Sequence, residues 1–461
     1  MNVILIWPFN QQLKKVQELF PLAFGYIISN IDRAVHKVTL LDCAIDRMDP
    51  DSTDFRTIIT SLKPDVVGVS WWSSNTEVVK RTLAVVKSIC NEAVTVVGGS
   101  HPTVAYQSLL DSPTIDFIFR GEAEIGFPML LDCIHEKKYS ELYRIPGLIF
   151  RDTRGKSVIN EQLYVSDLDS LGKVDYETLR LRRYHEAGYN YGGKAELSEG
   201  VLSAPIVATR GCPYLCEFCS SRAINGRIIR FHSAEYIANT ITDLYTLFNV
   251  RLISFIDDNF TFKTEYAEEV CDKIIKARLN ELRIATPIGI RFERMTKRLA
   301  NKMYAAGWRD VVIAPESGSP RTLRHMRKAV NLKKGPEAVA LFHDAGIKIH
   351  AFFMIGYPGE TSRDLLTTER FILENGFDNI DLHIFQPLPG TPVFDKLVKK
   401  KEIKPGFIPG GFYEVTYKPQ ELSREEIRDI ANRILNEFRD RKGWVYKDSA
   451  VYCVREHTAL S

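Results

Sequence analysis

The feature that most constrains the fold is a repeated alternation of short apolar runs with longer segments of helical period. Five such runs lie in the first 150 residues: Val3–Ile6, Val38–Leu41, Val66–Ser70, Val94–Val97 and Phe117–Phe119. They are nearly continuous rather than alternating, as in strands buried on both faces of a parallel sheet. Helical stretches such as Glu77–Cys90 separate them. We therefore expect residues 1–150 to form a Rossmann-like α/β domain, with its ligand beyond the carboxyl ends of the strands.

A second alternation fills residues 204–395. Its strand-like runs are Ile206–Thr209, Leu252–Ile256, Ile284–Ile290, Val311–Ala314, Ile349–Ile355 and Ile380–Phe385. Helix-like segments follow several of them, namely Ala267–Ala277, Lys297–Ala306 and Pro336–Ala345. A full eight-unit barrel needs about 250 residues, so six strand–helix units predict a partial β/α barrel.

Two regions carry weaker patterns. Residues 151–203 are polar, and we expect a linker that packs across the two domains. Residues 396–461 are expected to form a small, mostly helical C-terminal segment. In it, Ser423 followed by Glu426 has the spacing of a capping box, which predicts a helix that runs to about Arg441.

Composition excludes several classes of protein. The 461 residues are 45% hydrophobic, and 61 basic side chains nearly balance 58 acidic ones, which is ordinary for a globular enzyme and gives no reason to propose nucleic acid as a partner. The chain has no apolar run of about 18 residues, and Met1–Phe9 lacks the basic head of a signal peptide. We expect a soluble cytoplasmic protein with no membrane partner.

Three cysteines are crowded into eight residues on the loop that leaves the first barrel strand. Cys212, Cys216 and Cys219 are spaced by four and three residues. A structural zinc ion normally takes four protein ligands, and the nearby His232 is the candidate for a fourth. Three thiolates would instead leave one iron of a cubane cluster open to a small molecule. A zinc site completed by His232 or a distant ligand, and plain core cysteines, are the alternatives.

This pattern, Cys-x3-Cys-x2-Cys with the aromatic Phe218 before the last cysteine, resembles the signature of the radical S-adenosylmethionine (SAM) superfamily. Later motifs resemble its cobalamin-binding branch and fall at the ends of successive strands: Phe255–Thr261, Ala314–Ser319, Gly356–Thr361 and Pro387–Pro392. The resemblance covers residues 1 to about 395. It implies a catalytic [4Fe–4S] cluster on the three cysteines, SAM on the open iron, a 5'-deoxyadenosyl radical, and an external electron donor such as flavodoxin or ferredoxin.

The resemblance also suggests which residues surround SAM. They are Phe218, Asp257, Asp258, Asn259, Arg291, Glu316, Ser317, Gly356, Tyr357 and Pro358. The group Asp257–Asn259 is expected near the methionyl amine, with helix capping as the alternative. Arg291 is expected at the methionyl carboxylate, with a structural ion pair as the alternative. Glu316 and Ser317 are expected at the ribose or methionyl part, and Gly356–Pro358 at the adenine.

The first domain resembles the cobalamin-binding fold. The candidate contacts lie at strand ends: Ser70, Trp71, Trp72, Ser73, Ser74, Gly98, Gly99, His101, Thr103, Gly121 and Glu122. Glycines and small hydroxyl side chains there make room for a flat, wide ligand. The Gly-x-Gly-x-x-Gly fingerprint is absent, which argues against a nicotinamide cofactor.

The chain departs from the usual cobalamin-binding pattern in the loop that would lie at the lower face of the cobalt. Domains that coordinate it from below usually carry Asp-x-His-x-x-Gly after the first strand, but here the loop Trp7–Gln12 has no histidine. We expect cobalamin without a histidine lower ligand, and Trp71 or Trp72 as a cover for that face, with core packing as the alternative. His101 is expected to be a loop contact rather than a cobalt ligand. A domain that had lost cobalamin would show the same absence.

Three N-terminal cysteines invite comparison with the second cluster of methylthiotransferases. The spacing of Cys43, Cys90 and Cys133 does not match that family, and we expect buried structural thiols.

The leading hypothesis is a cobalamin-dependent radical SAM methyltransferase that acts on an unactivated carbon of a small-molecule or natural-product substrate. One alternative is a radical SAM dehydratase, cyclase or rearrangement enzyme in which cobalamin is absent or donates no methyl group. Another is a non-enzymatic cobalamin sensor or carrier with a structural cluster. The substrate pocket is expected at residues 165–200, the barrel mouth, and Phe412 and Tyr413.

Overall fold

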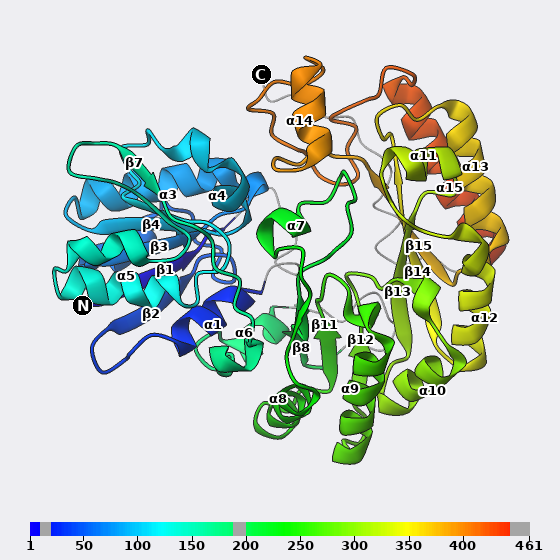
Figure 1. The fold of residues 1–461 in the computed structure, drawn as a ribbon, viewed down its shortest axis with the longest axis horizontal. Coiled ribbons are helices and arrows are strands. Elements are labelled where there is room, and N and C mark those ends of the chain that lie inside the picture. Colours follow the sequence, from blue (N-terminus) through cyan, green and yellow to red (C-terminus); the bar gives the residue numbers. More distant parts are fainter. Residues whose placement is uncertain (10–19, 188–199, 443–461) are drawn as a thin grey trace. The chain divides into compact units, whose positions relative to one another are not determined.

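The computed structural model describes residues 1–9, 20–187 and 200–442. The chain divides into two compact units, drawn in Figure 1. The first comprises Met1–Asn190 with Ala223–Arg230, and the second comprises Tyr191–Arg222 with Phe231–Ser461.

The first unit is built on a seven-stranded sheet in the order β2-β1-β3-β4-β5-β6-β7. Its strands are β1 (Asn2–Trp7), β2 (Lys37–Asp42), β3 (Val66–Ser70), β4 (Val94–Gly98), β5 (Phe117–Phe119), β6 (Leu148–Arg151) and β7 (Ser157–Ile159). Strands β1 to β5 are parallel, so the five predicted runs form the expected Rossmann-like sheet.

Helices cover both faces of this sheet (Figure 1). They are α1 (Leu22–Ser29), α2 (Thr53–Leu62), α3 (Thr76–Ile89), α4 (Ser100–Ala105), α5 (Gly126–His135) and α6 (Leu181–Glu186). On one face, Ile4 and Ile6 of β1 are buried in a single core with Phe55 of α2 and Val79 of α3. Full burial of each such side chain contributes about 1.5–3 kcal/mol, so this core holds the strand ends in place.

Residues 151–187, where we expect a linker, belong to the compact first unit. Strands β6 and β7 form an antiparallel hairpin that extends the sheet, and Gly155 closes its turn with a φ of 77°. Farther along, the fully buried Tyr184 donates a 2.6 Å hydrogen bond to Asp42 at the end of β2. The hairpin is therefore an addition to the predicted sheet.

The second unit contains two three-stranded parallel sheets. Strands β8 (Ser203–Ile206), β11 (Leu252–Phe255) and β12 (Arg283–Ala285) make one sheet, and β13 (Asp310–Glu316), β14 (Lys348–Ile355) and β15 (Asn379–Ile384) make the other. Isolated parallel bridges, Ile284 to Trp308 and Ile290 to Ile313, connect them. All six predicted strands are present, and they form the expected partial barrel.

Helices α8 (Ala234–Leu247), α9 (Thr264–Ala277), α10 (Lys297–Ala306), α12 (Gly335–Asp344) and α13 (Ser362–Glu374) follow these strands, and shorter elements complete the unit. The shorter elements are β9 (Thr209–Arg210), β10 (Arg230–Phe231), α7 (Ser221–Ile224), α11 (Pro320–His325) and α14 (Pro392–Lys399). The last helix, α15, runs over Arg424–Lys442. Ser423 and Glu426 bond each other's backbone N–H groups at 3.0 and 2.8 Å, which confirms the predicted capping box.

Across the described ranges, no helix combines the length and apolar character needed to cross a membrane.

Candidate cofactor sites

The cysteine loop lies between β9 and α7 at the carboxyl ends of the barrel strands. Cys216 is buried, Cys212 and Cys219 are half-buried, and all three are free thiols. Burial raises the pKa of each thiol, that of Cys219 to about 12, whereas Lys328 and Arg291 counteract the shift at Cys216. Cations of this kind favour the thiolate, which is the form that binds metal. The donor set therefore suits an iron–sulfur cluster.

A zinc site receives no support from the geometry. His232, the candidate fourth ligand of that alternative, is fully buried and stacks on Tyr236 with ring centroids 4.1 Å apart.

The loop is tied to the second half of the barrel. The backbone N–H of Glu217 donates to Met326 at 2.9 Å, and its carbonyl accepts from Val393 at 3.1 Å. The neighbouring Phe218 packs against a core that contains Tyr357. These contacts set where the thiols lie before any cofactor binds.

Asp257, which is expected near the methionyl amine of SAM, holds the chain that enters the loop. Its carboxylate accepts hydrogen bonds from the backbone N–H groups of Ala208 and Thr209 and, at 2.7 Å, from the Thr209 hydroxyl. Burial raises the pKa of Asp257 to about 7. Asp257 is thus a positioning residue.

Its neighbours in the sequence have different surroundings. Asp258 lies close enough to Cys212 and Cys219 to raise the pKa of both thiols. Asn259 is 2% exposed, yet neither polar atom of its amide has a hydrogen-bond partner among the described residues. Unpaired buried amides are rare and costly, so Asn259 fits a polar ligand at the end of β11.

At the end of β13, Glu316 has a φ of +69°, which is unusual for a residue with a side chain. Its carboxylate binds Lys328 at 2.9 Å. Burial alone would lower the pKa of Lys328, but the charges of Glu316 and Cys216 raise it overall. Sequence reasoning missed Lys328, because nothing in the sequence pairs it with a residue 12 positions earlier.

Ser317 and Arg291 make mainly internal contacts. The fully buried Ser317 hydroxyl lies 3.0 Å from that of Thr368 and accepts from Ser319 N–H at 3.1 Å. Arg291 pairs with Glu293 at 2.7 Å and lies 3.8 Å from the ring centroid of Tyr214 in the cysteine loop. The structural ion pair weighed as the alternative is therefore present.

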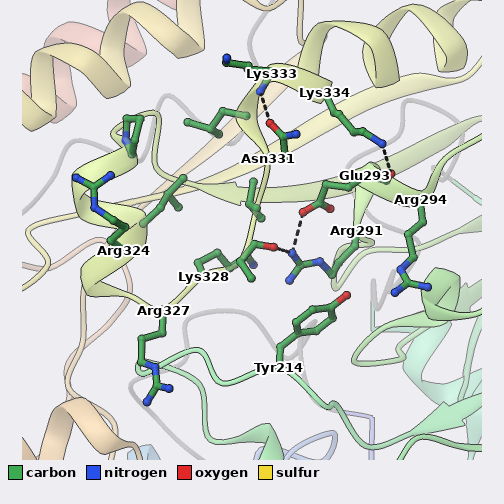
Figure 2. A pocket seen from close by; sticks show the side chains of 15 residues that line it. Tyr214, Arg291, Glu293, Arg294, Arg324, Arg327, Lys328, Asn331, Lys333 and Lys334 are labelled. Atoms are coloured by element: carbon green, nitrogen blue, oxygen red, sulfur yellow. Dashed lines mark hydrogen bonds and ion pairs between the residues drawn. The ribbon is translucent and has the colours of Figure 1, made fainter.

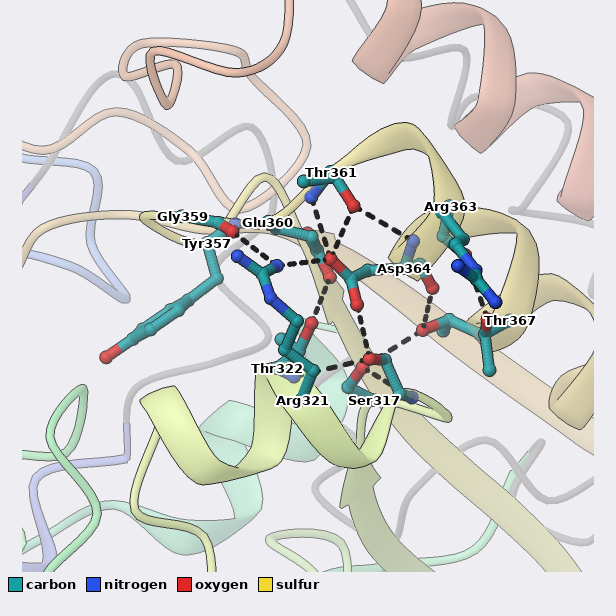
Figure 3. Close-up of polar contacts among 12 residues, drawn as sticks. Ser317, Arg321, Thr322, Tyr357, Gly359, Glu360, Thr361, Arg363, Asp364 and Thr367 are labelled. Carbon is teal, nitrogen blue, oxygen red and sulfur yellow. Dashed lines mark hydrogen bonds and ion pairs between the residues drawn. The ribbon is translucent and has the colours of Figure 1, made fainter.

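The carboxylate of Glu360, a residue that sequence reasoning did not single out, binds the backbone of the segment Gly356–Pro358. Figure 3 shows Glu360 and Tyr357 beside the polar contacts of Asp364. The Glu360 carboxylate accepts from the N–H groups of Gly356 at 2.7 Å and Tyr357 at 3.2 Å, and burial raises its pKa to about 8. The Tyr357 ring is buried against Phe385, so the ring is part of the core.

Beside it, Asp364 links two helix starts (Figure 3). It accepts from Ser319, which caps α11, and from Thr361, which caps α13, each at 2.6 Å. Arg321 also binds Asp364 at 2.6 Å. These bonds overcome burial and lower the pKa of Asp364 to about 2.

In the first unit, strand ends of the parallel sheet meet at one edge. Trp72 is half-buried there and lies 4.8 Å from Trp7, centroid to centroid. Trp71 is 1% exposed, and its indole N–H donates to Thr76 at 3.1 Å. The alternative of core packing therefore describes Trp71, whereas Trp72 keeps an open face.

One of the two glycines at this edge, Gly99, is sterically required. Gly99 has a φ of +107°, and a Cβ atom there would lie 2.7 Å from the carbonyl oxygen of Trp71. Gly98 is half-buried beside it, and Ser70 and Ser73 are half-buried at the end of β3, with Ser74 exposed. Small residues thus leave this edge open, as a flat ligand requires.

Other side chains that are predicted to contact cobalamin bind neighbouring residues of this chain. The Thr103 hydroxyl donates to Gly99 at 2.7 Å and accepts from Gly121 N–H at 2.9 Å. Glu122 forms an ion pair with Arg230 at 2.7 Å, and both side chains are 7% exposed. The His101 ring stacks on Trp71 and lies 3.0 Å from the Ser73 hydroxyl. Burial lowers the pKa of His101 to about 4, so it is neutral at pH 7.

Four described cysteines do not belong to the cysteine loop. Cys43, Cys133 and Cys271 are buried and Cys90 is half-buried, and burial raises the pKa of all four thiols. Cys453 and residues 10–12 of the predicted lower-ligand loop lie outside the described residues.

Comparison with known families agrees with this geometry. The radical SAM superfamily matches residues 206–372, which hold the cysteine loop and most of the barrel, and the B12 binding domain matches residues 14–131. Both domains of a cobalamin-binding radical SAM enzyme are thus found in this chain.

Relatives of this radical SAM chain extend over most of its length. It is 27% identical to an uncharacterized methyltransferase of Pyrococcus horikoshii, over 86% of this chain and 83% of that protein. It is 24% identical to cytidylyl-2-hydroxyethylphosphonate methyltransferase of Streptomyces wedmorensis, over 93% of this chain and 87% of that protein.

Among solved structures, the fold is similar to TsrM from Kitasatospora setae with cobalamin and a [4Fe-4S] cluster bound. The TM-score is 0.71 at 18% identity, covering 93% of this chain and 84% of that one. The cobalamin-dependent SAM radical enzyme OxsB has a TM-score of 0.68 at 18% identity, covering 96% of this chain and 62% of that one.

Proposed function

We propose that this radical SAM enzyme is a cobalamin-dependent methyltransferase that acts on an unactivated carbon of a small-molecule substrate and receives electrons from an external donor such as flavodoxin or ferredoxin. The observation that carries the proposal is that methyltransferase relatives align across both domains, over 86% and 93% of this chain. When bound, a reduced cluster with SAM supplies a 5'-deoxyadenosyl radical, and methylcobalamin supplies the methyl group.

In this proposal the chain's residues bind and orient those groups. Cys212, Cys216 and Cys219 hold the cluster, with the cations of Lys328 and Arg291 offsetting its negative charge. The unpaired amide of Asn259 binds a polar group of SAM. Glu360 holds the backbone of Gly356–Pro358 in place beside the adenine by accepting hydrogen bonds from the N–H groups of Gly356 and Tyr357.

At the edge of the first unit, Trp72, Ser70, Ser73 and the pair Gly98–Gly99 border the cobalamin. Because His101 bonds Ser73 and stacks on Trp71, we propose it as a wall of the site and not as the lower ligand of cobalt. Loss of a strong lower ligand is consistent with methyl transfer as a radical.

An aromatic group on the inner face of the barrel is the proposed substrate wall. Phe353 of β14 packs outward on Phe371 of α13, so Phe352 next to it faces inward. His383 of β15 lies 5.5 Å from the Phe352 ring and stacks on Phe412 at 5.2 Å. Tyr413 lies 5.4 Å from His383. This arrangement places the expected Phe412 and Tyr413 beside barrel residues and suits a substrate with a flat apolar part.

We also propose a cytoplasmic location. The seven described cysteines are all free, and the cytoplasm keeps thiols reduced.

The test is anaerobic reconstitution with iron, sulfide and cobalamin, followed by incubation with SAM and a chemical reductant. The proposal expects both 5'-deoxyadenosine and S-adenosylhomocysteine, since donation of a methyl group from SAM leaves the latter. The Cys216→Ala variant should make neither 5'-deoxyadenosine nor a cluster. Retained SAM cleavage by that variant would contradict the ligand assignment.

A second candidate is a radical cyclase. The chain is 26% identical to anaerobic magnesium-protoporphyrin IX monomethyl ester cyclase of Rubrivivax gelatinosus, over 86% of this chain and 69% of that protein. The same assay separates the two, because a cyclase would form 5'-deoxyadenosine without S-adenosylhomocysteine and a product that gains no methyl group.

A further inference from the structure

A strongly basic hollow opens in the second unit, and none of the aromatic residues described above lines it. It has a volume of about 890 Å³, and seven of its 15 lining residues are arginine or lysine. Figure 2 shows them around a single acidic residue, Glu293. The whole chain carries a formal charge of only +3, so positive charge is concentrated here.

The inner cations are already paired with carboxylates. Arg291 pairs with Glu293 at 2.7 Å and Lys328 with Glu316 at 2.9 Å, and both cationic side chains are at most 12% exposed. A site for a small anion needs buried donors that are free to converge on it. The inner wall of this hollow does not provide them.

The outer cations are exposed instead. They are Arg294, Arg324, Arg327, Lys333 and Lys334, carried by the segment after β12, by α11 and by the chain that leads to α12. The side chains of Arg324 and Lys333 have no ion-pair partner in the described part of the chain. Long, solvated cations of this kind contribute little to binding a small ligand, but together they attract a large acidic surface.

The hollow adjoins the cysteine loop. Tyr214, between Cys212 and Cys216, forms part of its wall, and Lys328 is close enough to affect the pKa of the Cys216 thiol. If the loop holds a cluster, this face is a short path by which an electron can reach it from outside the protein.

We propose that this basic hollow is the docking surface for an acidic one-electron carrier protein. The inference rests on the proposed function, in which each SAM cleavage consumes one electron. In the docking step the reduced carrier loses one electron and the oxidised cluster gains it, with no bond formed or broken and no proton moved. Complementary charge speeds encounter and sets orientation, which suits a transient redox complex.

The test compares two charge reversals in the full-length protein. The rim variant Lys333→Glu reverses one exposed charge at the rim of the hollow. The matched control, Lys276→Glu, changes an exposed lysine in the last turn of α9, which lies toward the amino ends of the strands. None of these side chains belongs to the proposed cofactor sites.

The first readout is binding of an acidic flavodoxin, in its oxidised form, to the immobilised protein at low and high salt. The rim variant should weaken binding at least about tenfold, which corresponds to about 1.4 kcal/mol, and reduce its salt dependence. The control should bind like wild type. Equal binding by the rim variant and wild type would overturn the proposal.

The second readout is 5'-deoxyadenosine formation with reduced flavodoxin and, separately, with dithionite. The rim variant should be slow with flavodoxin and normal with dithionite. Equal loss with both reductants would overturn the docking role. Tight binding of inorganic pyrophosphate that the rim variant abolishes would also overturn it, in favour of a small-anion site. Failure of the proposed function is distinguishable, since wild type would then form no S-adenosylhomocysteine with dithionite, while the binding readout still tests the surface.

Discussion

The Asp257→Asn substitution gives the sharpest test of how the cysteine loop is positioned. Three donors converge on the Asp257 carboxylate: the N–H groups of Ala208 and Thr209 and the hydroxyl of Thr209. An asparagine keeps one acceptor oxygen and turns an NH₂ group toward the other donors. At least one buried donor then loses its partner.

Each unpaired buried donor costs about 1–3 kcal/mol, and bonds to a charged acceptor are worth more than those to a neutral one, so we expect a loss of about 2–4 kcal/mol. If the loss is local, the amides of Ala208 and Thr209 should exchange hydrogen about 30 to 800 times faster, because 1.4 kcal/mol is a factor of ten. Iron content after reconstitution should also fall.

The assay is native-state hydrogen exchange by mass spectrometry on peptides that cover residues 203–212. Asp272→Asn is the matched control, because Asp272 is exposed and pairs only with Lys302 on the surface. It should change stability by less than about 0.5 kcal/mol. If Asp257→Asn leaves exchange and iron content unchanged but raises the SAM concentration needed for half-saturation, then Asp257 binds SAM and our reasoning is wrong.

Three further predictions concern stability. Asp364→Asn should lower the free energy of unfolding by about 2–4 kcal/mol in urea titrations, because it weakens two helix caps. The control Arg321→Ala removes a half-exposed partner of Asp364 and should cost less than about 1 kcal/mol. Comparable losses in the two variants would contradict the capping role. Burial lowers the pKa of His101 from 6.5 to about 4, so between these pH values the unfolded chain binds the proton more readily than the folded one. The stability that neutral His101 contributes is therefore present above pH 6.5 and is lost as the pH falls toward 4. His101→Gln should flatten that part of the pH profile of urea unfolding, and an unchanged profile would refute this assignment. Gly99→Ala should lower the free energy of unfolding by more than about 2 kcal/mol and reduce cobalamin retention, because its Cβ would clash with the Trp71 carbonyl. At the control position Gly155, φ is also positive at +77°, but no atom lies within 4 Å of an added Cβ, so Gly155→Ala should cost only about 1 kcal/mol. Equal losses of stability in the two variants would count against the clash.

The sequence predicted the architecture well because the strands of both units are continuous apolar runs. Val66–Ser70 and Ile349–Ile355, for example, have a pattern that only a doubly covered parallel strand satisfies. The hairpin β6–β7 was missed, although the turn residues Asp152 to Gly155 between apolar runs are a readable signal.

The details of the sites were less predictable, because they depend on contacts between distant residues. Glu122 meets Arg230 across 108 positions, and Asp257 meets Thr209 across 48. A motif places a side chain at the end of a strand, but whether that side chain faces a ligand or a neighbouring backbone depends on packing. For the same reason Trp71 and Trp72, adjacent in sequence and chemically identical, have different surroundings.

The central claim is that three thiols of one loop hold a [4Fe–4S] cluster with an iron open to SAM. The most direct measurement is the electron paramagnetic resonance spectrum of the anaerobically reconstituted, reduced protein with and without SAM, alongside its iron and sulfide content. We predict about four iron and four sulfide per chain and a signal that SAM changes. Bound zinc, a protein without iron, or a cluster signal that SAM leaves unaltered would contradict the account.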